Sequence, residues 1–125
     1  MGKRYLIDSN TLIEFQAKKL PANGQRFVSK TIDEEFNISI ISKIEVLGYP
    51  SVEQETNDFI TLATVFELDK NVAGKTIELR RQHKIKLPDA IIAATALTNG
   101  LDLISRNISD FKNIAGLNVI DPWNL

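Results

Sequence analysis

The chain has no cysteine and only one histidine among its 125 residues. Without cysteine there can be no disulfide, no thiolate zinc site and no cysteine nucleophile. A single histidine also excludes a metal site built from several imidazoles. Metal-ion chemistry in this chain therefore has to rely mainly on oxygen ligands, of the kind that Mg²⁺ and Mn²⁺ prefer.

Long apolar runs and a strong net charge are missing as well. No stretch reaches 18 consecutive apolar residues, so no membrane association is expected. Asp8 interrupts the apolar run near the N-terminus that a signal peptide would continue, and we predict a cytoplasmic protein. The net charge of −1 gives no global positive field, so a nucleic acid would have to be held by a local group of basic side chains.

Hydrophobic residues make up 43% of the chain and charged residues 25%, which is typical of globular domains. At this length, folding buries roughly two thirds of the surface that the unfolded chain exposes. No linker, repeat or low-complexity segment divides the sequence. We therefore expect a single domain over residues 1–125.

Short β-branched runs alternate with helical patterns along the chain. Strands are predicted at 4–7, 37–42, 64–68, 101–105 and 117–121. Helices are predicted at 10–15, over 27–36, within 42–50, over 52–63, from about 71 to 83, within 87–100 and briefly after 106, with 16–25 as a connection. The alternation favours an α/β sandwich around a mostly parallel sheet, in which ligands gather beyond the carboxyl ends of the strands.

Acidic residues follow the ends of three predicted strands, and a fourth opens the most apolar helix: Asp8, Glu45, Asp110 and Asp89. Each alone has an ordinary explanation, because an acid at a helix start caps the helix or gains roughly 0.3–1 kcal/mol from its dipole. The spacing of Ser42 and Glu45 fits a capping box, as does that of Thr11 and Glu14. Asn107 could likewise cap the short helix that contains Asp110.

Taken together, these four acids suggest more than helix capping. If the strands are parallel, the acids converge on one edge of the sheet, where their charges repel unless a cation is present. A divalent metal with oxygen ligands, Mg²⁺ or Mn²⁺, suits such a site. A metal held in this way is suited to phosphoryl chemistry, because it activates water and neutralises charge on a phosphate.

Residues 75–86 form the one strongly basic segment, with Lys75, Arg80, Arg81, Lys84 and Lys86 against a single acid, Glu78. A charge run of this kind usually forms the solvated face of a helix. Its alternative role is to bind the phosphates of a nucleic acid backbone without regard to base sequence. Trp123 could stack on a base, although packing of the C-terminus against the body is the simpler interpretation.

Four segments resemble the PIN-domain nucleases in their order and approximate spacing: YLIDSNTLIEF, SIISKIEVLGY, KLPDAIIAATAL and LISRNISDF. The resemblance extends from about residue 4 to residue 120, and it is strongest to the compact VapC-type toxins of toxin–antitoxin pairs. It implies a three-layer α/β/α sandwich and a Mg²⁺- or Mn²⁺-dependent endoribonuclease. It also implies a small antitoxin whose C-terminal tail covers the active site, and a homodimer.

The resemblance assigns roles to individual residues by their motif positions. Asp8, Glu45 and Asp89 would be the three principal acids, and Asp110 the fourth catalytic and metal-binding acid. Asn107 would then hold water or a metal, while Asn10 and Ser105 are supporting polar residues. The basic residues of 75–86 would hold the RNA backbone.

Two alternatives stand beside a PIN nuclease. A catalytically silent PIN-like domain could bind RNA or a protein without cleaving, since position 107 is not acidic. A phosphatase with an aspartyl nucleophile is less favoured, because haloacid-dehalogenase-type enzymes carry a second Asp where this chain has Asn10.

Overall fold

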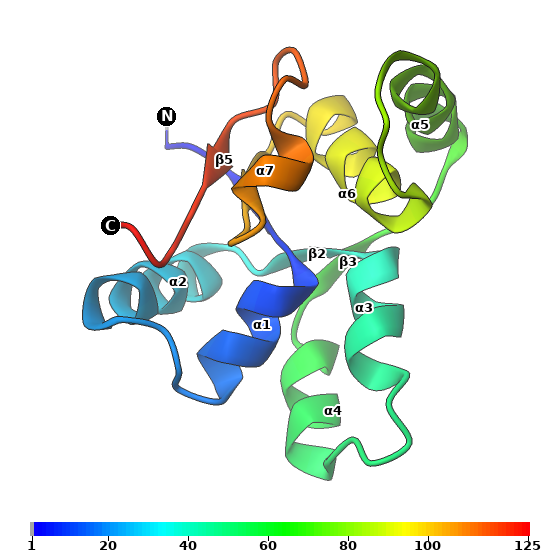
Figure 1. Cartoon of the computed structure of the whole chain (residues 1–125). Coiled ribbons are helices and arrows are strands. Elements are labelled where there is room, and N and C mark those ends of the chain that lie inside the picture. Colours follow the sequence, from blue (N-terminus) through cyan, green and yellow to red (C-terminus); the bar gives the residue numbers. More distant parts are fainter. Residues whose placement is uncertain (1) are drawn as a thin grey trace.

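The computed structural model describes residues 2–125, in which short strands alternate with helices (Figure 1). The strands are β1 (Tyr5–Ile7), β2 (Asn37–Ser39), β3 (Thr64–Phe66), β4 (Asp102–Ile104) and β5 (Val119–Ile120). The helices are α1 (Ser9–Gln16), α2 (Ala22–Glu34), α3 (Ile40–Leu47), α4 (Gln54–Thr61), α5 (Lys70–Gln82), α6 (Leu87–Thr98) and α7 (Ile108–Phe111). Every element that the sequence predicts is present.

All the strand pairs are parallel. Strand β4 pairs with β1 on one side and with β5 on the other, and β2 pairs with β3. The two groups meet where β2 lies beside β1, and there the Asn37 side-chain amide donates to the Tyr5 carbonyl at 3.0 Å. The spatial order is therefore β3, β2, β1, β4, β5. Strand β1 is central, and its carboxyl end leads directly into Asp8.

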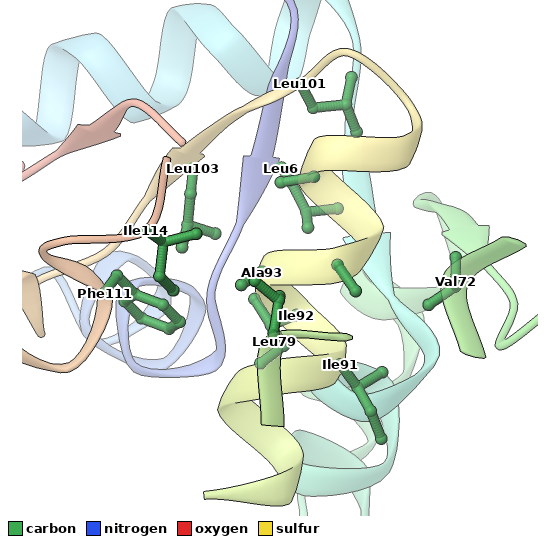
Figure 2. Packing of buried hydrophobic residues seen from close by; sticks show 12 residues of the cluster. Leu6, Val72, Leu79, Ile91, Ile92, Ala93, Leu101, Leu103, Phe111 and Ile114 are labelled. Carbon is green, nitrogen blue, oxygen red and sulfur yellow. The ribbon is translucent and has the colours of Figure 1, made fainter. Parts of the chain in front are cut away.

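Two hydrophobic cores lie on opposite faces of the strands. Leu6 and Leu103 belong to the first core with residues of α5, α6 and α7, whereas Ile7 and Ile104 belong to the second with residues of α1, α2, α3 and α4. Because successive side chains of a strand point to opposite faces, β1 and β4 each supply both cores. Figure 2 shows Leu6 against α6 in the first core, and Leu103 beside Phe111 and Ile114. The predicted α/β/α sandwich is confirmed.

Helix α6 is the most deeply buried helix of the described chain, with residues 90–96 all buried. Pro88 lies in its first turn, where a missing N–H costs nothing. Gly100 follows its end with φ of +66°, a conformation that glycine adopts without strain. Both boundary predictions are confirmed. No helix within residues 2–125 combines the length and the apolar character that crossing a membrane requires.

Two boundaries differ more than the others from the prediction. The second strand ends at Ser39 and not at Ser42, because the Ser39 side chain accepts the N–H of Ile41 at 3.0 Å and starts α3. Helix α2 begins at Ala22, inside the predicted connection, directly after Pro21. Local composition misleads at both places: isoleucines favour strand, and Pro with Gly favours a loop, whereas capping and packing favour helix.

Substitution of alanine for glycine should have opposite effects on the free energy of unfolding at two helical positions. A Cβ on Gly24 in α2 would lie 1.9 Å from the Pro122 carbonyl oxygen, whereas a Cβ on Gly74 in α5 would meet open space. Gly74→Ala should raise the free energy of unfolding by about 0.5–1 kcal/mol through helix propensity. Gly24→Ala should lower it by roughly 1–3 kcal/mol, because the backbone has to move. Urea unfolding followed by circular dichroism measures both, and equal responses would contradict the packing described.

Candidate active site

Asp8 forms the base of the site at the carboxyl end of β1. Its side chain is only 4% exposed, and it caps α1 by accepting the N–H of Ser9 at 2.8 Å. Its other carboxylate oxygen accepts the hydroxyl of Ser105, at the end of β4, at 2.7 Å. The Asp8 backbone N–H donates to the Ile104 carbonyl at 3.0 Å. This carboxylate is thus held by both central strands.

Burial raises the pKa of Asp8 from 3.8 to about 6. The hydrogen bonds from Ser105 and the Ser9 N–H act in the opposite direction, since they stabilise the charged form. The negative charges of Asp89 and Glu45 raise the pKa further. A buried carboxylate with two acids near it is destabilised in its charged form, which a bound cation would relieve.

Glu45 reaches the site from the exposed side of α3. The predicted capping box with Ser42 is wrong, because Ser39 is the N-cap and Ser42 is buried inside the helix. The Glu45 carboxylate instead accepts the hydroxyl of Ser9 at 2.5 Å, and that hydroxyl lies 3.1 Å from the Ser42 hydroxyl. The Ser9 side chain therefore links the starts of two helices and holds Glu45 toward Asp8.

Asp89 stands in the first turn of α6 and is partly buried. Its pKa is raised by burial first, then by the charges of Asp110 and Glu45, while Lys86 acts in the opposite direction. Since Asp89 also raises the pKa of Asp8, it interacts with all three other acids. Figure 1 shows the N-terminal ends of α1, α3 and α6 directed toward the middle of the molecule.

Asp110 and Asn107 lie at the exposed rim, in and before α7. Asp110 joins the acids through its effect on Asp89. Asn107 occupies the N-cap position of α7, but its side chain makes no capping hydrogen bond. Its backbone N–H donates to the Ser105 hydroxyl at 3.1 Å, so the same hydroxyl contacts Asp8 and Asn107. The structure brings the four predicted acids together around one edge of the sheet.

Ser9 and Ser42, which the sequence prediction omitted, support the acids, whereas the side chain of Asn10, which it included, does not hydrogen-bond to them in the described chain. Ser9 and Ser42 connect α1 to α3 beside Glu45. The side-chain oxygen of Asn10 accepts the Thr11 hydroxyl at 3.2 Å, and in residues 2–125 its side chain forms no hydrogen bond with an acid. The only feature of the sequence that points to Ser9 is its position directly after Asp8. A serine at that position is common at the start of any helix, so it does not indicate a role in the site.

The basic segment is divided by its contacts. Arg80 donates to the Ile85 carbonyl at 2.6 Å and holds the turn between α5 and α6, while Lys75 pairs with Glu78 at 3.4 Å within α5. The remaining three basic side chains are exposed on the last turn of α5 and the turn after it: Arg81, Lys84 and Lys86. Of the five, only Lys86 has a described electrostatic effect on the acids, through Asp89.

The donor chemistry fits a hard divalent cation. All candidate ligands are oxygens, and the charged forms of Asp8 and Asp89 are disfavoured by burial and by neighbouring acids. Within residues 2–125, no three His, Cys, Asp or Glu side chains already converge as a ready ion-binding group. Asp8, which is buried, and Asp89, which is partly buried, are the inner part of the candidate set, and Glu45 and Asp110 are its exposed part.

The sequence model of the PIN domain family matches residues 5–117. The chain belongs to the PIN domain family. Ribonuclease VapC1 of Rickettsia felis is 28% identical to it over 127 residues, which cover 92% of this chain and 93% of that protein. Membership of the PIN domain family argues against the alternative of a phosphatase with an aspartyl nucleophile.

Solved structures agree with a PIN domain of this size. A toxin–antitoxin complex from Klebsiella pneumoniae contains a chain that is 30% identical, with a TM-score of 0.76 over 97% of this chain and 99% of that one. A DNA-bound VapBC from Salmonella typhimurium contains a chain that is 25% identical, with a TM-score of 0.78 over the same shares. The resemblance to VapC-type PIN domains is confirmed.

Because the pKa of Asp8 is raised, we predict that the ionised Asp8 carboxylate destabilises the folded protein at neutral pH. Asp8 takes up a proton more readily when folded, so its contribution to stability falls as pH rises from about 4 to 6. Asp8→Asn, which cannot ionise, should raise the free energy of unfolding at pH 7.5 by about 1–3 kcal/mol in chelator. Urea unfolding at pH 4.5 should show a much smaller difference. A variant less stable than the wild type at pH 7.5 would contradict this account.

Proposed function

We propose that the chain is a metal-dependent endoribonuclease that hydrolyses RNA phosphodiester bonds, and that it is the toxin of a type II toxin–antitoxin pair. The observation that carries this proposal is that four carboxylates, from four separate elements of a PIN domain, act on one another electrostatically around Asp8 and Asp89, beyond the carboxyl end of the central strand. The name of the Rickettsia felis relative, a ribonuclease, supports RNA as the substrate.

Each acid has a distinct part in the proposed site. Asp8 is the fixed anchor, since hydrogen bonds to both of its oxygens restrain the carboxylate. Asp89 interacts with all the other acids, while Glu45 and Asp110 close the site from the rim. These residues would hold Mg²⁺ or Mn²⁺, which supplies Lewis-acid activation of water and neutralises charge on the phosphodiester. Asn107 and the carboxylate oxygens would orient the attacking water by hydrogen bonds.

The turn between α5 and α6 would hold the RNA backbone. Lys84 and Lys86 are exposed there. Lys86 is the N-cap residue of α6, the helix that carries Asp89 in its first turn. Positive side chains at this point attract phosphate groups toward a site that is otherwise acidic. Arg80 and Lys75 are engaged within the protein, so we assign them a smaller share.

An antitoxin is the proposed protein partner. Matching chains from Klebsiella pneumoniae and Salmonella typhimurium are described as parts of toxin–antitoxin and VapBC assemblies. We propose that a small antitoxin covers the acids with its C-terminal tail, inserting a basic side chain among them, and that the chain forms a homodimer. Co-purification with the product of the adjacent gene tests the partner. A neighbour that encodes no small protein would favour a free-standing RNA-processing nuclease.

Removal of a single acid should abolish cleavage. Asp89→Asn should lower the rate at which a labelled RNA pool is cut in Mg²⁺ or Mn²⁺ by at least about 100-fold, because the central negative ligand is lost. Chelator should do the same to the wild type. Asp33→Asn, an exposed position on α2, is the matched control and should cut normally.

If the chain were a silent PIN-like domain, the same cleavage experiment would give a different result. It would cut no RNA with either ion and would bind Mn²⁺ no more tightly than Asp89→Asn does. Calorimetric titration with Mn²⁺ distinguishes the two functions, because the nuclease requires an affinity that depends on Asp89. Absence of both cleavage and such binding in folded, antitoxin-free protein would reject the proposed nuclease.

Loss of the basic turn should weaken RNA binding without altering the chemistry. Arg81→Ala with Lys84→Ala should raise KM several-fold and leave kcat within about twofold, since phosphate contacts are lost while Lys86, which acts on Asp89, is kept. The slope of log KM against log salt should fall by about 0.7 per contact removed. Lys30→Ala on α2, where Lys30 pairs with Glu34 at 4.0 Å, is the control. An unchanged salt dependence would place the RNA elsewhere.

A further inference from the structure

The last five residues cross two helices of the second core. Residues 121–125, here called the C-terminal strap, follow β5 and run onto α2 (Figure 1). Pro122 is buried where Gly24 leaves room for its carbonyl, and the Asn23 side-chain amide donates to the Leu125 carbonyl at 3.2 Å. Within the strap, the N–H of Trp123 donates to Asp121 at 2.9 Å. The strap therefore has a defined path.

Trp123 attaches the strap to α1 through Glu14. The indole N–H donates to one carboxylate oxygen of Glu14 at 3.1 Å, and Arg106 donates to the other at 2.9 Å. The Arg106 guanidinium also lies over the indole, 4.1 Å from the ring centre, in a cation–π contact. Glu14 is thus no capping-box residue, and Trp123 packs against the body of the protein.

Arg106 is the point at which these contacts reach the acid site. It lies between Ser105, whose hydroxyl donates to Asp8, and Asn107, whose N–H donates to that hydroxyl. Asp110 follows in the same segment, where its N–H donates to the Asn107 carbonyl at 3.1 Å. The side chains of Asn107 and Asp110 are exposed, so the backbone of 105–110 sets where they stand.

We propose that the C-terminal strap, acting through Trp123, Glu14 and Arg106, positions the segment 105–110 and thereby sets the affinity of the acid site for a divalent cation. Arg106 is a positioning residue in this scheme, because its guanidinium is occupied by Glu14 and the indole. The cation affinity rests on the proposed function, whereas the positioning of 105–110 can be measured without any metal.

Gly24→Ala displaces the strap without touching the site, because its Cβ would overlap the Pro122 carbonyl. Gly74→Ala makes the same chemical change in open space on α5 and is the matched control. The chain has one tryptophan, so intrinsic fluorescence reports Trp123 alone. In metal-free protein, Gly24→Ala should shift the emission to longer wavelength and speed amide hydrogen exchange at 105–110 at least fivefold. Gly74→Ala should change neither.

With metal present, Gly24→Ala should raise the Mn²⁺ Kd at least threefold and lower kcat for RNA cleavage. KM should stay within twofold, because the basic turn after α5 is untouched. Trp123→Phe keeps a ring beside Arg106 but removes the N–H to Glu14, and it should show the same exchange and Mn²⁺ effects in a smaller degree. This variant decides the question if Gly24→Ala does not fold.

A strap that moves in fluorescence while the exchange at 105–110 and the Mn²⁺ Kd stay at wild-type values would overturn the inference. If the wild-type protein neither binds Mn²⁺ nor cuts RNA, the proposed function fails. The exchange rates at 105–110 then still decide whether the strap positions the segment.

Discussion

A buried carboxylate at the end of the central strand is the constraint on which the rest of this structure depends. Asp8 is almost fully shielded from water, with a pKa near 6. Only a Ser9 N–H, at the start of α1, and a Ser105 hydroxyl, at the end of β4, hydrogen-bond to its carboxylate oxygens in the described chain. These bonds orient the group but do not neutralise it, so the fold retains an unfavourable charge where a catalytic ligand would need one.

The parallel sheet surrounds this carboxylate with more acids. Crossovers return the chain to the same edge, so Glu45 on α3 and Asp89 on α6 come near Asp8 from distant parts of the sequence, and Asp110 on α7 comes near Asp89. Between Asp8 and Asp89, only Asp89 has its pKa lowered by a cationic side chain of the described chain, that of Lys86. A divalent ion and the basic side chain of the proposed antitoxin would both neutralise the same excess of negative charge, so binding of one would oppose binding of the other.

Supporting contacts lie one layer behind the acids. The Ser9 hydroxyl holds Glu45, and the Ser105 hydroxyl connects Asp8 to the backbone of Asn107. Arg106, stacked on Trp123 and paired with Glu14, extends this support to the C-terminus. Exposed acids such as Asp110 cannot be held by burial, so the position of their backbone has to come from such contacts.

Local patterns determined much of this protein. Strand and helix periods, Pro88 and Gly100 around α6, and the placement of acids after strands identify the α/β class and the four carboxylates, because these signals depend on neighbours within a few residues. Tertiary structure alone decided that Ser9 meets Glu45. It also decided that Glu14 serves Arg106 and Trp123. Such contacts join residues 36 to 109 positions apart, and local periodicity carries no record of which distant side chain will satisfy a given hydroxyl or carboxylate.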